Sequence, residues 1–445
     1  MSNDLTVGIP RVGWLHHQKL PDPAQPAPCM LLDDGKQITL RVPLLSGTDD
    51  MHERWFFAPV AKLADDPDRT KHDYSAPETV AFIDRHGIVM LVGCSWSFAG
   101  WSNYGSEGVI TAKRAVLGGN EYRYPMINAM RTEISGLSDW LELSGVDVNV
   151  DRDVNGRAHS ITVTSQTTEP VRLSPRLNFS VGATWRTRSV TDGRGIEAPA
   201  ELITQVAKVR SWDDHAELHR ALLGLVEISA WNRIGFRTME VRRSDDPEKA
   251  LAGNVLTQKW NPVRSHERDH VEASAPGEPR RFLFTYADVG SRGVREWLRV
   301  RRTFQRGVQQ MHALLHQPGM FIEVQQANVG GALEAIGYIL ALEAGKSANG
   351  AARETYAHRL ERLRQEIPER VLDRDWPERS RAAFMAAKHV DAPASPVDQQ
   401  LHAIGENILA YRYWLARRLG ATDSQLLRLI SLDPVVRRYG LAVAE

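Results

Sequence analysis

Residues 29–42 read CMLLDDGKQITLRV, a stretch that is typical of a β-hairpin. The dipeptide Asp34-Gly35 separates two apolar runs, Cys29–Leu32 and Ile38–Val42. Asp-Gly favours a tight turn because both residues tolerate a positive φ angle. We therefore predict two antiparallel strands that meet at this dipeptide.

Similar patterns fill the chain up to residue 211. Turn dipeptides at His86-Gly87 and Asn155-Gly156 separate further pairs of strand-like runs. These runs are Thr79–Asp84 with Ile88–Gly93, and Val146–Val150 with His159–Thr164. Other strand candidates are Gly108–Leu117, Ala129–Trp140, Val171–Val181 and Glu201–Ser211. Many short strands with regular turns predict a β-rich N-terminal part, either a sandwich or a distorted barrel.

The pattern changes after residue 212. Asp213-Asp214 can cap a helix whose apolar residues recur at steps of three and four between Leu218 and Ile228. Strand-like runs then return at Ile234–Val241, Val255–Trp260 and Arg281–Thr285.

From Ser291 onward, apolar residues at helical spacing predict helices and no strands. The helix candidates are Ser291–His316, Val324–Leu342, Arg353–Glu366, Pro377–Val390, Pro396–Leu419 and Asp423–Ile430. We therefore predict an α+β protein. Residues 1–290 form a β-rich domain with a sub-boundary near residue 200, and residues 291–445 form an α-helical bundle.

The charge balance limits the classes of function. The chain has 445 residues, with 55 basic and 55 acidic side chains. Zero net charge argues against a polybasic protein that coats nucleic acid or anionic lipid, but it permits a local basic site. Arginine provides 45 of the 55 cations, which suits phosphate recognition and also fits a codon bias toward arginine.

The sequence also favours a cytoplasmic protein without membrane partners. The N-terminus lacks the basic and apolar segments of a signal peptide, and the apolar runs are too short to span a bilayer. Cys29 and Cys94 belong to no Cys/His cluster, so we predict neither a disulfide framework nor a zinc site. No phosphate-binding loop, zinc-protease motif or serine-hydrolase motif occurs. We expect no cofactor and no metal.

One predicted helix carries a strongly basic face. Between Ser291 and Gln310, six arginines accompany a single acidic residue, Glu296. Four of them recur at three- and four-residue steps and so share one face: Arg295, Arg299, Arg302 and Arg306. Such a face can bind a nucleic-acid backbone without reading its sequence. The alternative is a solvated or interdomain face whose arginines pair with neighbouring acids.

A second group of candidates lies near the end of the Pro377–Val390 helix. Arg381 precedes His389 by eight residues, an offset of about 80° that leaves both on one broad face, and Lys388 adjoins them. Histidine can move protons at neutral pH, and arginine can hold a scissile phosphate. The three residues therefore suit metal-independent phosphodiester cleavage. The alternative is a histidine that caps the helix or favours its dipole.

The order of short motifs along nearly the whole chain resembles that of a known family. The motifs are EISGLSDW at 133–140, the helix at 222–231, REWL at 295–298, GALEA at 331–335, KHVD at 388–391 and YRYWLARRL at 411–419. This layout is similar to bacterial ApeA-like proteins, in which an ApeA N-terminal domain precedes a HEPN domain. The resemblance implies anti-phage defence, with an N-terminal domain that senses infection and a HEPN domain that is a metal-independent ribonuclease. HEPN domains commonly dimerise and place Arg and His in a shared cleft.

The chain departs from the HEPN motif, which is Arg, four to six residues, and His. Before His389 the matching positions hold Ala382, Ala383 and Phe384, so Arg381 lies one residue too far away. The loose spacing does occur before His16, His17, His159, His215, His270, His312 and His358, which is seven of fifteen histidines and so discriminates poorly. Within the bundle, we rank the pair Arg353 and His358 second to His389. On one continuous helix their side chains would be offset by about 140° and would lie on poorly matched faces.

The leading hypothesis is a defence ribonuclease that a phage-derived trigger activates through the N-terminal domain. It would be a homodimer through the helical domain, with RNA phosphates as its ligand. The alternative is a degenerate HEPN module that binds RNA or a protein without cutting; it predicts a buried His389, or Arg381 paired with an acid such as Glu378. A third hypothesis is a ligand-binding β-sandwich with an aromatic pocket around Trp96, Trp101 and Trp185.

Overall fold

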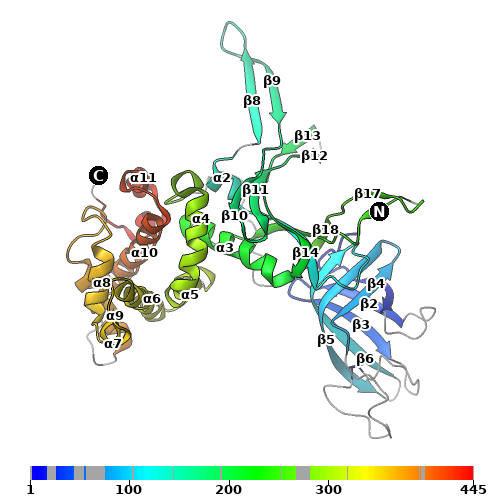
Figure 1. The fold of residues 1–445 in the computed structure, drawn as a ribbon, viewed down its shortest axis with the longest axis horizontal. Coiled ribbons are helices and arrows are strands. Elements are labelled where there is room, and N and C mark those ends of the chain that lie inside the picture. Colours follow the sequence, from blue (N-terminus) through cyan, green and yellow to red (C-terminus); the bar gives the residue numbers. More distant parts are fainter. Residues whose placement is uncertain are drawn as a thin grey trace. The chain divides into compact units, whose positions relative to one another are not determined.

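The computed structural model describes residues 3–17, 27–44, 55–56, 76–102, 105–143, 145–190, 193–250, 252–266, 281–317, 319–389, 391 and 396–443. These residues belong to two compact units, each built from three chain segments. Unit 1 contains residues 1–133, 202–218 and 236–272, and unit 2 contains residues 134–201, 219–235 and 273–445. Figure 1 labels elements of both units.

Unit 1 contains a closed barrel of six antiparallel strands. In barrel order these are β6 (Gly105–Leu117), β3 (Ile38–Leu44), β2 (Ala27–Asp33), β1 (Arg11–His16), β4 (Thr79–Asp84) and β5 (Gly87–Ser102), and β5 pairs back onto β6. The side chains that face inward form one apolar cluster, which includes Leu31, Leu40, Phe82 and Trp96. The barrel, one of the two predicted architectures, is thereby confirmed.

The three predicted hairpins form at their turn dipeptides. Gly35 between β2 and β3 has a φ of +84°, and Gly156 between β8 (Val146–Arg152) and β9 (Ala158–Ser165) has a φ of +78°. Gly87, at the junction of β4 and β5, has a φ of +128°. A residue with a Cβ atom would be strained in this region, so glycine sets the place of each turn.

Further strands extend the sheet of unit 1 beyond β6. They follow the order β18 (Asn261–Ser265), β15 (Phe236–Arg242), β7 (Met126–Ile134) and β14 (Ala200–Ser211). A separate hairpin joins β16 (Glu248–Lys249) to β17 (Val255–Thr257). Unit 2 contributes β8 with β9, β10 (Val171–Ser174) with β11 (Phe179–Ala183), and β12 (Arg186–Val190) with β13 (Gly193–Glu197).

Several predicted strands are shorter than expected. The Ala129–Trp140 run stops being a strand at Ile134, because Gly136 has a φ of +76° and starts helix α2 (Leu137–Leu141). The Val171–Val181 run is split by a 3-10 turn at Arg176–Asn178, where Leu177 and Asn178 both have positive φ.

The strand predicted at Arg281–Thr285 is wrong. Phe282, Leu283 and Phe284 are buried in a segment without regular structure, so their apolar character reflects burial and not strand pairing. Thr285 then caps the next helix, because its backbone N–H donates to Asp288 at 2.7 Å. A short apolar run does not distinguish a strand from other buried segments.

Unit 2 contains the predicted helical region. Its helices are α2, α4 (Tyr286–Thr303), α5 (Gln305–His316), α6 (Ile322–Glu343), α7 (Ala348–Ala352), α8 (Tyr356–Arg364), α9 (Trp376–Lys388), α10 (Val397–Leu419), α11 (Asp423–Leu427) and α12 (Pro434–Tyr439). Helix α10 is central, since residues 403–416 are buried without interruption. Among the described residues, no helix is both long and apolar enough to cross a membrane.

Several helix boundaries differ from the prediction. Helix α3 (Trp212–Ala230) begins in unit 1 and ends in unit 2, and Ser211 caps it by accepting the Asp214 N–H at 3.2 Å, in place of the predicted Asp213-Asp214 cap. The single helix predicted at 291–316 is two helices, α4 and α5, because Phe304 leaves helical geometry at φ −106° and ψ 29°. The Phe304 ring is buried against Trp414.

Candidate functional site

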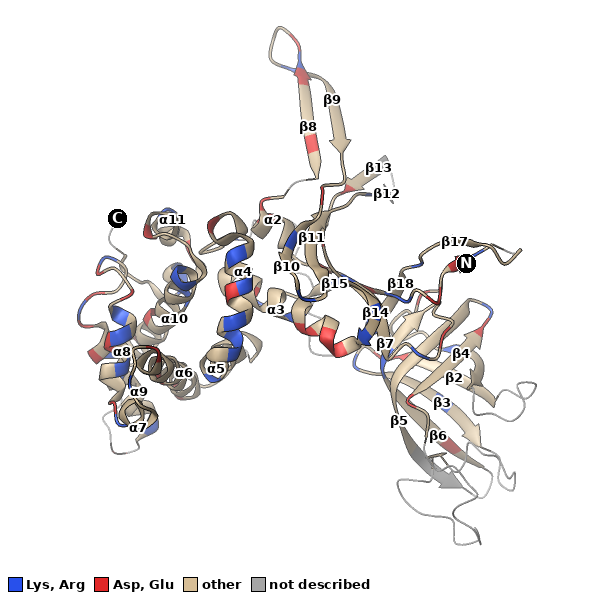
Figure 2. Ribbon diagram, viewed as in Figure 1, with Lys and Arg blue, Asp and Glu red and all other residues tan. Residues whose placement is uncertain are grey.

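The arginine face lies on α4 and α5, as Figure 2 shows by the blue bands along these helices. The buried side of α4 carries Val294, Trp297 and Val300, and the Trp297 indole N–H donates to the Ala221 carbonyl at 2.6 Å. The opposite side therefore faces solvent. The four arginines predicted to share this face are all exposed: Arg295, Arg299 and Arg302 on α4, and Arg306 on α5.

Within the described part of the chain, ion pairing among these four arginines is restricted to Arg299. Its Nε donates to both Glu296 carboxylate oxygens, at 2.9 and 3.1 Å. This hydrogen bond raises the pKa of Arg299 and lowers that of Glu296. Arg302 contacts the Leu298 carbonyl, at 3.2 Å, and neither it nor Arg306 has an acidic partner among the described residues. Pairing with neighbouring acids thus accounts for one of the four.

A cavity of about 730 Å³ opens beside this face, between α5 and the helices that follow. Arg302, Arg306 and Arg359 line it, together with one acid, Glu334. Its other polar lining residues include Gln305, Gln309 and Tyr338. The cavity wall therefore carries a positive charge excess and has the size of a small-ligand pocket.

Arg359 is the buried member of this cavity. Its Nη1 donates to Glu334 Oε1 at 2.9 Å, and its Nη2 donates to the Ala351 carbonyl at 3.1 Å. These bonds fix Arg359, whereas the exposed Arg302 and Arg306 keep guanidinium donors available for an anion.

The structure places Lys388 and His389 at the C-terminal end of α9 and Arg381 near the middle of the helix. His389 is exposed and ends the helix, with its backbone N–H donating to the Met385 carbonyl at 2.9 Å. Lys388 is also exposed, and its Nζ lies 5.6 Å from the centre of the Phe384 ring. Within the part of the chain that is described, no hydrogen bond joins His389 to Arg381.

Arg381 is paired with an acid. Its Nε donates to Glu378 Oε2 at 2.9 Å, and its Nη2 donates to Glu378 Oε1 at 2.6 Å. The bidentate bond raises the pKa of Arg381 and lowers that of Glu378. Both side chains are exposed, so the pair is worth little to stability and a stronger anion could displace Glu378.

The second-ranked pair does not lie on one helix. Arg353 is the C-cap residue that follows α7, and His358 lies in the first turn of α8, where its backbone N–H donates to Thr355 Oγ1 at 3.3 Å. The predicted helix over 353–366 begins only at Tyr356, because Thr355 caps it. The angular offset expected for one continuous helix therefore does not apply to this pair.

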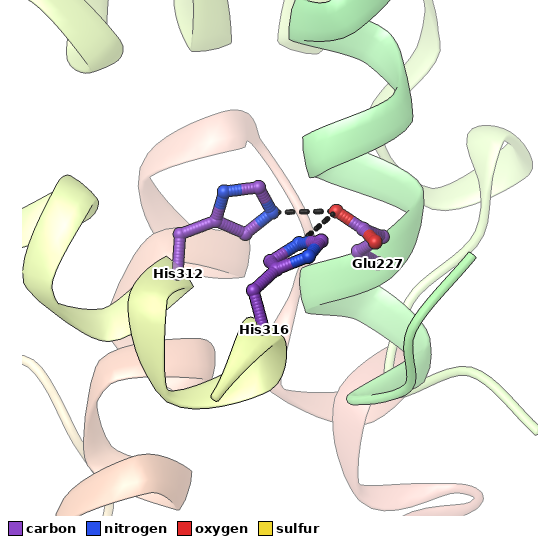
Figure 3. Close-up of side chains that lie close together, drawn as sticks. All are labelled: Glu227, His312 and His316. Atoms are coloured by element: carbon purple, nitrogen blue, oxygen red, sulfur yellow. Dashed lines mark hydrogen bonds and ion pairs between the residues drawn. The ribbon is translucent and has the colours of Figure 1, made fainter. Parts of the chain in front are cut away.

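One cluster was missed from the sequence: Glu227 on α3, and His312 and His316 on α5 (Figure 3). The two histidines are four residues apart, a spacing that places them on one helix face. This four-residue spacing is the feature of the sequence that could have indicated the cluster. Glu227 lies 85 residues before His312, so no local pattern joins it to the pair.

Trp96 cannot contribute to the predicted aromatic pocket, because it is buried in the barrel core. Trp96 is 7% exposed, and its indole N–H donates to the Pro77 carbonyl at 2.8 Å inside the barrel core. Trp185 is half exposed in unit 2, and the side chain of Trp101 lies outside the described residues.

The fold and site define an α+β protein that combines a β-barrel with a helical region bearing an arginine face. The sequence matches the family described as ApeA N-terminal domain 1 over residues 13–297, more than half of the chain. The chain belongs to this family, which suggests a protein of anti-phage defence. No curated protein and no solved structure matches the chain. The match ends within α4, so the HEPN domain remains a prediction.

Proposed function

We propose that this chain is an anti-phage defence protein whose helical region, residues 291–445, binds RNA through the arginine face. The observation that carries the proposal is the exposed pair Arg302 and Arg306, which line a 730 Å³ cavity without an acidic partner among the described residues. A phage-derived trigger would act through the β-rich N-terminal part.

The physical argument rests on the form of the guanidinium group. Arginine offers a planar set of donors that matches two phosphate oxygens, and it stays charged at every physiological pH. Arg295, Arg302 and Arg306 present such donors to solvent, with α4 held rigidly by the buried Trp297. Contacts of this kind bind the RNA backbone irrespective of sequence.

Binding without cutting has the better support of the two RNA hypotheses. It predicted either a buried His389 or an Arg381 engaged by an acid, and Arg381 forms the bidentate pair with Glu378. A phosphate held by Arg381 would have to compete with this carboxylate. The structure leaves His389 exposed, so the burial alternative does not hold.

A HEPN ribonuclease is the second candidate, favoured by the solvent access of Lys388 and His389. In it His389 would take the proton of a ribose 2′-OH or protonate the leaving oxygen, without a metal. Arg381, released from Glu378, and Lys388 would hold the phosphate. Because one chain supplies few such groups, this candidate includes a homodimer that pairs two α9 helices.

The RNA-binding proposal predicts a large loss of affinity when the cavity arginines change sign. Arg302→Glu combined with Arg306→Glu removes two phosphate contacts, each worth about 1.5–3 kcal/mol as a charged hydrogen bond. We expect a labelled single-stranded RNA to bind at least roughly 100-fold more weakly, as measured by fluorescence anisotropy. The slope of log affinity against log salt should fall in magnitude by about 1.4, at about 0.7 per phosphate contact.

The matched control is Arg428→Glu with Arg437→Glu, which makes the same change of net charge on exposed arginines outside the cavity lining. This control should bind RNA nearly as the wild type does. Absence of RNA binding by the wild type, or an equal loss in both double variants, would refute the proposal.

The two RNA hypotheses differ in their response to His389→Ala. If the chain binds RNA without cutting, wild type and variant should leave RNA equally intact in EDTA, with and without lysate from infected cells. Gel analysis of end-labelled RNA measures this. Cleavage by the wild type that disappears in His389→Ala would establish the ribonuclease instead.

A further inference from the structure

Two histidines and one glutamate converge in unit 2, at a place that the RNA-binding proposal does not use. Glu227 comes from the second half of α3, and His312 and His316 come from consecutive turns of α5 (Figure 3). The His312 and His316 rings meet edge to face with their centres 4.8 Å apart. The imidazoles therefore approach the same carboxylate from one side.

The distances are close to those of a metal site. His312 Nε2 lies 2.6 Å from Glu227 Oε2, and His316 Nε2 lies 3.2 Å from the same oxygen. All three ligand atoms are within 4.8 Å of one another. Zinc bonds of about 2.0–2.1 Å in a tetrahedron hold ligand atoms about 3.3–3.4 Å apart. To admit an ion, the Glu227–His312 distance of 2.6 Å would lengthen by about 0.7–0.8 Å and the Glu227–His316 distance of 3.2 Å by about 0.1–0.2 Å.

The Glu227 carboxylate is buried and oriented toward the two histidines. Its side chain is 1% exposed, and its Oε1 accepts the Ile234 backbone N–H at 3.0 Å, which leaves Oε2 directed at the histidines.

The two histidines are partly exposed. His312 and His316 are 32% and 30% exposed, so both imidazole rings border solvent. Residue 224, one turn before Glu227 on α3, is a glycine. A Cβ atom there would be in van der Waals contact with the His312 ring, at 3.4 Å from Cε1 and 3.5 Å from Nε2.

We propose that Glu227, His312 and His316 form a binding site for Zn²⁺ or a similar divalent transition metal. Two imidazoles exclude Mg²⁺ and Ca²⁺, which require oxygen ligands, whereas zinc accepts two histidines and one carboxylate. Three protein ligands leave a fourth position for water, the arrangement of an open site. The ion would tie α3, which lies within the family match, to α5, which lies beyond it.

The test is a zinc titration of the metal-free full chain, followed by calorimetry or by competition with a chromophoric chelator. We expect one Zn²⁺ per chain at this site, and Co²⁺ should give the visible absorption of a tetrahedral complex. Glu227→Gln and His316→Gln should each weaken binding by more than the roughly 10–100-fold typical of changes outside the ligand shell. His358→Gln, at an exposed histidine elsewhere in unit 2, should bind as the wild type does.

Far-UV circular dichroism of each variant checks that it is folded. Should the buried Glu227→Gln variant fail to fold, the partly exposed His316→Gln variant decides the question. A wild type that takes up no Zn²⁺ would overturn the proposal and leave a carboxylate hydrogen-bonded by two histidines. Zinc binding that is unchanged in His316→Gln would overturn it as well.

Discussion

Arg412→Ala is expected to lower the free energy of unfolding by about 3–5 kcal/mol, the cost of breaking a buried ion pair from one side. The Arg412 and Asp433 side chains are both 0% exposed, and Arg412 Nη1 lies 2.7 Å from Asp433 Oδ1. The substitution would leave the Asp433 carboxylate charged and unpaired in the core. Asp433 also caps α12 by accepting the Val435 N–H at 2.9 Å, so this helix would loosen too.

Arg412 also forms hydrogen bonds with backbone carbonyls, in addition to its ion pair with Asp433. Its Nε donates to the Ile228 carbonyl at 2.8 Å, and its Nη2 donates to the Ser229 carbonyl at 2.6 Å. These carbonyls belong to the last turn of α3, where the i+4 bonds of the helix end. The Ile228 carbonyl also accepts the Trp231 N–H at 3.3 Å, and the Ser229 carbonyl also accepts the Leu283 N–H at 2.9 Å. One side chain of α10 therefore satisfies the end of α3 and the start of α12 together.

The measurement is urea unfolding followed by circular dichroism in the far ultraviolet. The control is Arg417→Ala on the same helix, where an exposed arginine pairs with Asp423 at 3.2 Å. An exposed pair contributes about 1 kcal/mol or less. Equal destabilisation by the two substitutions would contradict the assigned role of Arg412.

The sequence predicted best what depends on neighbouring residues. The hairpin turns at Asp34-Gly35, His86-Gly87 and Asn155-Gly156 are local, and each formed where the dipeptide stands. The closure of the barrel through pairing of β3 with β6, and of β1 with β4, joins residues far apart in the chain. The periodicity of apolar residues does not indicate which distant strands pair, so the sequence could not distinguish a sandwich from a barrel.

The errors have a common physical cause. The helix break at Phe304 and the unpaired run at Phe282–Phe284 both result from burial of aromatic rings in tertiary packing. The secondary-structure propensity of the local sequence does not indicate such burial. Similarly, the motif at 411–419 predicts a helix, but nothing in it shows that Arg412 is buried while Arg417 is exposed.

In the candidate site, too, local features could be predicted from the sequence and long-range contacts could not. The arginine face follows from three- and four-residue spacing and was predictable, since a helix face is a local property. The cavity between α5 and later helices was not, because Arg306 and Arg359 are far apart in the chain and meet only through packing. Glu227 joins His312 and His316 for the same reason.

The second large effect is expected in phage defence itself. Arg302→Glu combined with Arg306→Glu should abolish protection, because the variant presents two negative charges to RNA where the wild type presents two positive ones. Both side chains are exposed, so the substitutions should leave the fold intact. His389→Ala should keep its protection if the chain acts by binding.

The most direct test of this account is the efficiency of plating of a phage panel on cells that express the wild type, Arg302→Glu/Arg306→Glu or the control Arg428→Glu/Arg437→Glu at equal levels. For every phage that the wild type restricts, we predict full plating on the cavity variant and continued restriction by the control. Continued restriction by the cavity variant would contradict the claim that this protein defends its host through the arginine face of its helical region.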